Sequence, residues 1–133
     1  MLPVNYWAII VAAILRMVVG SIWYSPIAFV KPWQALTGVT PESMQKGLAR
    51  AIVIDLVMSL IMAFVIANIV VGSNLGGWLN GALAGFWLWL GFVLATHLPL
   101  WAYENRPLKL IAIGAGSNLV SIVLMTILLV LWR

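Results

Sequence analysis

The stretch from residue 48 to residue 71 decides the fold and reads LARAIVIDLVMSLIMAFVIANIVV. It is longer than the ~20 apolar residues with which an α-helix crosses the hydrocarbon core of a bilayer. Asp55 interrupts it, and a charged side chain at mid-bilayer costs roughly 3 kcal/mol on insertion scales unless it finds a partner. The stretch therefore predicts a membrane-spanning helix with one ionisable residue that needs a partner.

The rest of the chain has the same character. Three further apolar runs of similar length cover residues 2–21, 78–98 and 108–132. Hydrophobic residues make up 65% of the chain and charged residues 8%, and the mean hydropathy is +1.13. This composition excludes an ordinary soluble domain. We predict an all-α, polytopic integral membrane protein in which residues 1–133 form a single four-transmembrane-helix bundle.

The segment of residues 24–47 is the longest one outside the predicted spans. Its first part, residues 26–38, is apolar, aromatic and lightly basic, which favours a short helix lying in the membrane interface. Pro32 must lie at the start of that helix or kink it. Residues 40–42, Thr-Pro-Glu, then provide an N-cap, a proline at the first helical position and an acid near the helix N-terminus. We expect the helix that begins there to run directly into the second span.

The distribution of basic residues predicts the orientation of the bundle. Four spans place both termini on one side of the membrane. On that side we count a single basic residue, Arg133. The opposite side carries Lys31, Lys46, Arg50, Arg106 and Lys109. Because cytoplasmic segments carry the excess of Lys and Arg, we predict that the first and third connections are cytoplasmic and both termini external. The basic side is also expected to contact anionic lipid head groups.

Polar residues of several spans gather at one depth. Arg16 lies about 12 Å from the inner end of the first span and Asp55 about 11 Å from the same face, at 1.5 Å per residue. Ser59 and Asn118 lie within about a helical turn of this depth. We therefore predict a polar intramembrane site formed by these four residues.

Three interpretations of Arg16 and Asp55 are open at the level of sequence. The first is a structural ion pair that fixes helix register. In the second, the charges line a polar cavity, where Arg16 binds an anion or Asp55 takes up a proton or a cation. In the third, each charge meets a second subunit or a lipid head group.

Small residues recur at four-residue spacing along the spans and predict close helix packing. The glycines expected to serve it are Gly20, Gly77, Gly81, Gly85 and Gly114. A second set of residues follows the inner ends of the first and third spans, where residues 99–107 are expected to form a short return loop. It predicts a cytoplasmic vestibule of Trp23, Tyr24, His97, Trp101, Glu104 and Arg106. The alternative is that these residues form an aromatic belt at the membrane interface and hold the loop in place. His97 is either a proton relay to Asp55 or a polar anchor at the interface.

Several classes of function are not expected. The chain has no cysteine and a single histidine, which leaves no thiolate or multi-histidine metal site within one chain. It shows no catalytic template, such as a nucleophile elbow, a P-loop or an HExxH sequence. Basic patches interleaved with aromatic residues, which single-stranded nucleic acid requires, are also missing. We expect no enzyme activity, no metal, no cofactor and no nucleic acid partner.

Several short motifs resemble a known family. They are NYWAI at residues 5–9, GSIWYSP at 20–26, Phe29, Lys31, Trp33, LTG at 36–38, ENRPLK at 104–109 and Asn118. The chain resembles the small bacterial membrane proteins grouped as domain of unknown function 1761, over nearly its whole length. The resemblance implies a four-helix protein of the bacterial inner membrane and no particular activity.

Two functional hypotheses follow from these features. We favour a small transporter or channel-like protein for an ion or metabolite, in which the polar intramembrane site contacts the solute. The alternative is a non-transporting accessory or structural membrane protein that binds lipid or a partner membrane protein. In either case we expect a homo-oligomer, because four short helices alone barely enclose a cavity.

Overall fold

The computed structural model describes residues 3–133, and within them the chain is helical throughout its length apart from short connections. The elements are α1 (Tyr6–Trp23), α2 (Val30–Thr37), α3 (Pro41–Lys46), α4 (Leu48–Gly72), α5 (Trp78–Trp89), the π-helical η1 (Leu90–Leu94), α6 (Ala95–Glu104) and α7 (Leu108–Leu131). Among the described residues, four stretches are long and apolar enough to cross a membrane: α1, α4, the continuous run Trp78–Glu104, and α7. The predicted all-α membrane bundle of four spans is confirmed.

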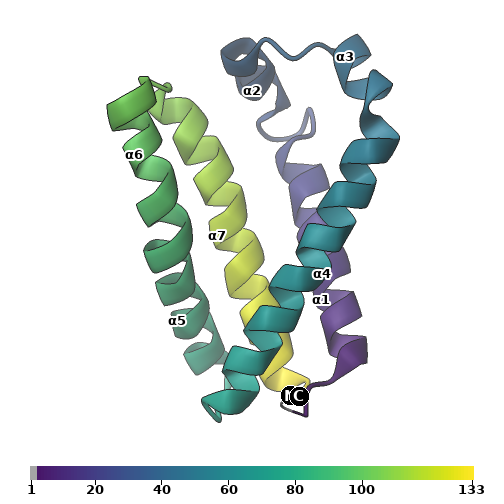
Figure 1. Cartoon of the computed structure of the whole chain (residues 1–133), viewed down its shortest axis with the longest axis vertical. Helices are drawn as coiled ribbons and strands as arrows, with labels where there is room; N and C mark the ends of the chain where they lie inside the picture. The colour runs from purple at the N-terminus through teal and green to yellow at the C-terminus, as the bar shows by residue number, and fades with distance from the viewer. Residues whose placement is uncertain (1–2) are drawn as a thin grey trace.

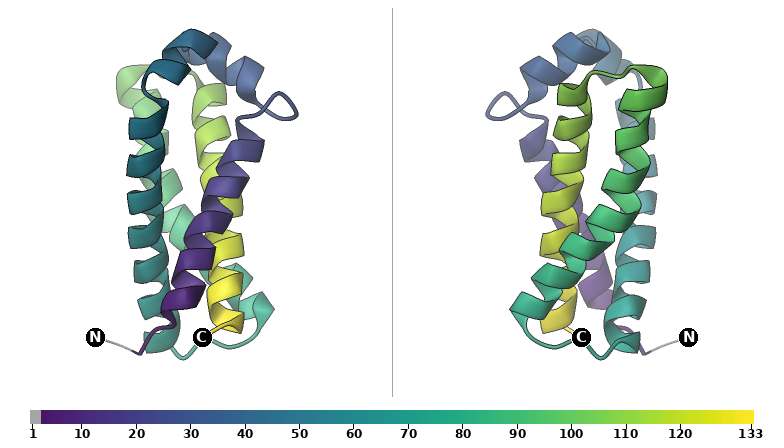
Figure 2. Two further views of the ribbon diagram at one scale, coloured as in Figure 1. Left: turned by 90° about the vertical axis from the view of Figure 1, so that its right-hand side faces the viewer. Right: turned by 90° about the vertical axis from the view of Figure 1, so that its left-hand side faces the viewer.

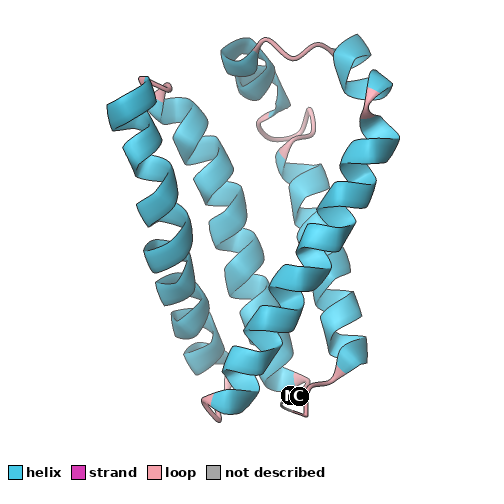
Figure 3. Ribbon diagram, viewed as in Figure 1, coloured by secondary structure: helices cyan, strands magenta, loops and turns pink. Residues whose placement is uncertain are grey.

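The bundle is organised around α7, which packs against α1, α4, α5 and α6 (Figure 1). Residues 3–5, 73–77 and 132–133 lie at one end, hereafter the terminal end, where Asn5 Nδ2 lies 3.5 Å from the carbonyl oxygen of Trp132 (Figure 2). The opposite end, hereafter the loop end, carries α2, α3 and residues 105–107. Short connections join the helices at both ends (Figure 3). The two ends therefore differ: the short helices α2 and α3 cover the loop end, and only short connections lie at the terminal end.

Small side chains hold α1, α4 and α7 together at the terminal end. Ala8, Ala12 and Ala63 are fully buried, and Ala67 is nearly so. They belong to the rows of four-residue spacing seen in the sequence, and they pack with larger side chains of α7 such as Met125. Small residues allow helix backbones to approach closely, which drives association in lipid. Toward the loop end the helices diverge.

The contact between α5 and α7 depends on two glycines. A Cβ atom placed on Gly85 would lie 2.8 Å from the Cα atom of Val123, and one placed on Gly81 would lie 3.1 Å from the Cα atom of Ile127. These obstacles are backbone atoms, so they cannot move aside by a side-chain rotation. Any larger residue at Gly85 must push the two helices apart.

The start of the first span differs from the predicted one. Residue 2, where the span was predicted to begin, lies outside the described residues, and α1 begins at Tyr6. Asn5 caps the helix, because its side-chain oxygen accepts hydrogen bonds from the backbone N–H groups of Trp7 and Ala8 at 3.1 and 3.3 Å.

The prediction that residues 99–107 form a loop is wrong. The third span continues through Pro99 to Glu104, and the connection consists of residues 105–107. A proline is tolerated inside a membrane helix when other groups satisfy the backbone atoms around it. Pro99 lacks the N–H group that would bond the Ala95 carbonyl in an α-helix, and the π turn of η1 lies directly before this part of the span.

The segment between the first two spans is also more divided than expected. The predicted interfacial helix is present as α2, with Pro32 in its first turn. Thr40 caps α3 as predicted and forms a capping box with Ser43. The expected continuation of α3 into the second span is wrong, because the chain leaves helical geometry at Gly47 before α4 begins. Glycine loses little when it departs from a helix, so the break falls there.

The close contact at Gly85 gives a first prediction. Gly85→Ala should lower the free energy of unfolding in detergent by about 1–3 kcal/mol, because the added methyl group overpacks the α5–α7 contact. Gly91→Ala is the matched control, since a Cβ atom at Gly91 meets no atom within 4 Å. Its effect should stay within about 0.5 kcal/mol or be stabilising. Equal losses in the two variants would contradict the close packing described above.

Candidate functional site

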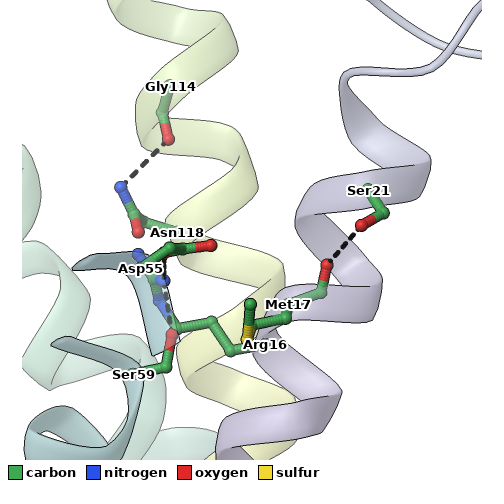
Figure 4. A network of polar contacts seen from close by, with 7 residues as sticks. All are labelled: Arg16, Met17, Ser21, Asp55, Ser59, Gly114 and Asn118. Carbon is green, nitrogen blue, oxygen red and sulfur yellow. Dashed lines mark hydrogen bonds and ion pairs between the residues drawn. The ribbon is translucent and has the colours of Figure 1, made fainter. Parts of the chain in front are cut away.

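Arg16 and Asp55 meet within one chain. The Nη1 atom of Arg16 on α1 donates to Oδ1 of Asp55 at 2.6 Å and to Oγ of Ser59 at 2.8 Å, both on α4 (Figure 4). Ser59 is completely buried, whereas the Asp55 side chain keeps 48% of its accessible surface and that of Arg16 keeps 21%. The predicted pairing of the two charges is thus realised inside the bundle, and neither a second subunit nor a lipid is needed for it.

This ion pair leaves hydrogen-bonding capacity unused. It rests on a single nitrogen of the guanidinium and a single oxygen of the carboxylate. The Nε atom of Arg16 is buried and has no hydrogen-bond partner among residues 3–133. A buried donor without a partner costs about 1–3 kcal/mol. Arg16 is therefore incompletely satisfied by the described chain.

The pair lies in the wall of a cavity of about 530 Å³ between α1, α4 and α7. The α7 wall is polar, with Asn118 and two serine side chains, Ser117 and Ser121. The amide nitrogen of Asn118 donates to the carbonyl of Gly114 at 3.2 Å, so Asn118 lines the cavity without touching the ion pair. Trp33 of α2 and Met44 of α3 also contribute, which places the cavity in the half of the bundle toward the loop end.

A second, smaller cavity of about 230 Å³ lies beside the first. Tyr24 and Trp33 border both cavities, and their rings form an edge-on pair with centroids 5.3 Å apart. Burial raises the pKa of the Tyr24 phenol, and the positive charge of Arg16 offsets this in part. Tyr24 is therefore a neutral hydroxyl group at neutral pH. This aromatic pair forms the partition between the two cavities.

His97 and Arg106 line the second cavity and not the first. The Nδ1 atom of His97 lies 2.7 Å from the carbonyl oxygen of Val93. A carbonyl only accepts, so Nδ1 carries the hydrogen and Nε2 is left available as an acceptor in the neutral ring. The structure does not bring His97 to Asp55, and no direct proton relay joins them.

The residues of the predicted vestibule are dispersed. Tyr24, His97 and Arg106 meet at the second cavity. Glu104 pairs with Arg106 at 2.9 Å, and both side chains are about half exposed. Trp101 instead lies with Tyr103 beside an apolar surface pocket along α6, because α6 continues as a helix and turns this side chain outward.

Trp23, the remaining residue of the predicted vestibule, packs against α7. The indole nitrogen of Trp23 donates to the carbonyl of Ile113 on α7 at 2.8 Å. The Trp23 ring covers Gly116, where a Cβ atom would lie 3.0 Å from its Cζ2 atom. Trp89 on α5 makes a similar bond to the carbonyl of Ala115 at 2.7 Å.

The predicted packing glycines divide into three groups. Gly81 and Gly85 lie against the backbone of α7, as described above. Gly77 precedes α5 with a φ of 85°, a conformation that glycine adopts without strain. Gly20 and Gly114 instead line the main cavity, where the missing side chains leave space.

Sequence reasoning missed several residues of the site. Trp33, Met44, Met17 and Ser21 line the main cavity but were not assigned to it. For Trp33 a signal existed, because an aromatic residue on a short amphipathic helix must bury one face. Which cavity that face covers depends on how α2 folds back on the bundle, and no local pattern encodes this.

The ion pair gives a second prediction. Arg16→Met and Asp55→Met should each destabilise the protein by about 3–5 kcal/mol, reduced to the extent that the half-exposed Asp55 is solvated, because each leaves a charge without its partner. The double variant should recover most of that loss. Chemical denaturation in detergent measures all three. Strictly additive losses would show that the two charges do not stabilise one another.

The family assignment agrees with the resemblance seen in the sequence. The family described as "Protein of unknown function (DUF1761)" matches residues 7–130, nearly the whole chain. No curated protein and no solved structure matches the chain. The family description names no activity, so the cavity and its ion pair are the basis on which a function can be argued. The chain, with its four helices long and apolar enough to cross a membrane, belongs to the DUF1761 family of proteins of unknown function.

Proposed function

We propose that this protein is a small carrier that binds a polar solute in the main cavity and moves it across the membrane. One observation carries the proposal: an incompletely satisfied ion pair in the wall of a cavity large enough for a metabolite. Intramembrane ionisable residues that face a cavity commonly mark solute pathways. The Arg16–Asp55 pair has this position.

The location of the cavity supports transport more than static binding. Arg16 lies about 12 Å from the inner end of its helix, close to the middle of a hydrocarbon core of about 30 Å. Many transporters bind their solutes near this depth. Toward the terminal end the cavity is closed by apolar packing of Ala8, Ala12 and Ala63. Toward the loop end the helices diverge (Figure 1). This arrangement fits a carrier that faces one side.

The setting of the carrier is part of the same proposal. The basic residues at the loop end favour a cytoplasmic position for α2 and α3, with both termini external, in a bacterial inner membrane. Apolar side chains such as Val53, Val57 and Ile61 on the outer face of α4 are exposed, as lipid contact or a second copy of the chain would require. The Arg16–Asp55 cavity has no pair of acid and base poised for chemistry, which favours binding over catalysis.

A non-transporting accessory protein is the second candidate. It is favoured by the direct bonds from Arg16 to Asp55 and Ser59, which fix the register of α1 against α4 as a structural ion pair would. Under this alternative the cavity is a permanent recess open to one side. The two candidates therefore differ in whether water reaches the cavity from both sides of the membrane.

Cysteine accessibility tests the proposal, and the absence of native cysteines makes single substitutions unambiguous. Ser117→Cys reports on the cavity, and Val57→Cys at similar depth on the outer face of α4 is the matched control. In sealed vesicles, a membrane-impermeant maleimide should label Ser117→Cys from both sides if the carrier alternates. Val57→Cys should stay unlabelled, because a thiol in lipid does not form the reactive thiolate.

Two exposed positions report the sidedness of the vesicles. Gly76→Cys marks the terminal end and Lys46→Cys marks the loop end. Labelling of Ser117→Cys solely from the side that labels Lys46→Cys would support the accessory protein and overturn transport. Labelling of Val57→Cys at the same rate would show that the reagent enters the membrane, and the assay would be repeated with a larger reagent.

A further inference from the structure

The main cavity contains one positive and one negative side chain. Of its described lining residues, Arg16 and Asp55 are the charged ones, and the others are apolar, aromatic, amide or hydroxyl side chains and glycines. Tyr24 is neutral, as shown above. The cavity is therefore electrically balanced, yet it presents a cation and an anion in one wall. This combination restricts the charge of a solute that can bind there.

Both charged groups keep hydrogen-bonding capacity outside their mutual bond. On Arg16 the bonds to Asp55 and Ser59 both involve Nη1, and Nε is buried, whereas Nη2 takes part in none of the hydrogen bonds among residues 3–133 and the side chain keeps 21% of its accessible surface. On Asp55 the bond to Arg16 involves Oδ1, and about half of the side chain is exposed. An acceptor can therefore approach the guanidinium, and a cation can approach the carboxylate, while the ion pair stays intact.

The paired charges of the cavity oppose a solute with a single charge. A lone cation meets Arg16, which does not lose its proton in proteins. A lone anion meets Asp55, and in both cases the complex buries a net charge, which is costly in a low-dielectric medium. A solute that carries both signs places each beside its opposite and keeps the complex neutral. A neutral complex is also easier to move across a bilayer.

The aromatic partition adds a surface suited to the cationic group. Tyr24 and Trp33 border the cavity toward the loop end, and their rings are packed edge-on at 5.3 Å. Tryptophan and tyrosine faces attract ammonium groups, and quaternary ammonium groups in particular. Tyr24 and Arg16 are separated by eight positions on the chain, or about 12 Å along a helix. The charged and aromatic groups are thus distributed over the length of a small metabolite.

We propose that the solute of the main cavity is a small zwitterion, with a carboxylate or phosphate group that binds Arg16 and an amine or quaternary ammonium group that binds Asp55. This inference rests on the proposed function, because it names the solute class for the same cavity. The ammonium group lies between Asp55 and the Tyr24–Trp33 pair. The carboxylate or phosphate accepts a hydrogen bond from the free guanidinium nitrogens.

Three probes of nearly equal shape test the charge requirement. Glycine betaine is the zwitterion, 3,3-dimethylbutyrate replaces its nitrogen by carbon and is an anion, and choline is the corresponding cation. Titration calorimetry on the purified full chain, in nanodiscs of phosphatidylglycerol, should give binding of glycine betaine. The two singly charged probes should bind at least about tenfold more weakly, equivalent to about 1.4 kcal/mol. Equal or tighter binding of 3,3-dimethylbutyrate would overturn the inference in favour of an anion site in which Asp55 is protonated.

Variants locate the binding in the cavity. Arg16→Met/Asp55→Met removes both charges and should abolish betaine binding, with its fold checked by circular dichroism. The matched control is Lys46→Met/Glu42→Gln, which removes one cation and one anion from exposed positions of α3 and should leave the affinity unchanged. Ser117→Leu fills the cavity without altering charge and should also abolish binding. Retention of full affinity by Ser117→Leu and by the double methionine variant would overturn the assignment.

A zwitterionic head group of a membrane lipid offers the same chemistry as a soluble metabolite. Phosphatidylethanolamine added to the nanodiscs should compete with glycine betaine if the head group is the source, and should leave betaine binding unchanged if the source is soluble. Both results support the zwitterion site. Absence of any binding by glycine betaine and of any effect of phosphatidylethanolamine on thermal unfolding would overturn it.

The two proposals fail in different ways. If glycine betaine binds but Ser117→Cys is labelled from one side only, the zwitterion site is supported and transport is overturned. If Ser117→Cys is labelled from both sides but no zwitterionic probe binds, the carrier function is supported and the proposed solute class is overturned.

Discussion

The close packing of small side chains at the terminal end is the constraint on which the rest of the structure depends. Ala8, Ala12, Ala63 and Ala67 are buried between α1, α4 and α7 and let these helices approach closely. Lipid provides no hydrophobic difference between helices, so contact of this kind must hold the bundle together. Helices joined tightly at one end can diverge at the other, and the cavity occupies the space that this divergence leaves. The polar site is thus a consequence of apolar packing elsewhere.

Within that divergence, Arg16, Asp55 and Ser59 restore a link between α1 and α4. The bond from Arg16 to buried Ser59 anchors the guanidinium, while Asp55 remains half exposed beside it. An ion pair that served stability alone would gain by using both nitrogens of the guanidinium fork and by excluding water. The geometry instead combines a fixed arginine with a partly accessible carboxylate. This geometry allows a structural role and the proposed binding role in one cluster.

Much of this arrangement could be predicted from the sequence, because the relevant signals are local and periodic. Apolar runs of span length, alanine and glycine rows, and two charges at equal depth gave the four helices and the Arg16–Asp55 pair. The predictions that were wrong concern features that depend on tertiary contacts. The helix continues through Pro99 after a π turn in η1, and the place of Trp33 depends on how α2 folds back. Orientation, assembly into a homo-oligomer and the absence of enzyme activity stay predictions.

The two indole hydrogen bonds to α7 have a mechanical consequence. Trp23 donates to the carbonyl of Ile113, and Trp89 donates to the carbonyl of Ala115. These two carbonyls are about 200° apart around α7, so the two rings contact α7 from nearly opposite sides. Rotation or sliding of α7 would break both bonds, which therefore couple α1 and α5 to α7 as one block. The N-terminal half of α4 is exposed and begins at Gly47 without a side-chain cap. Displacement of this half of α4 must break the bonds from Arg16 to Asp55 and Ser59.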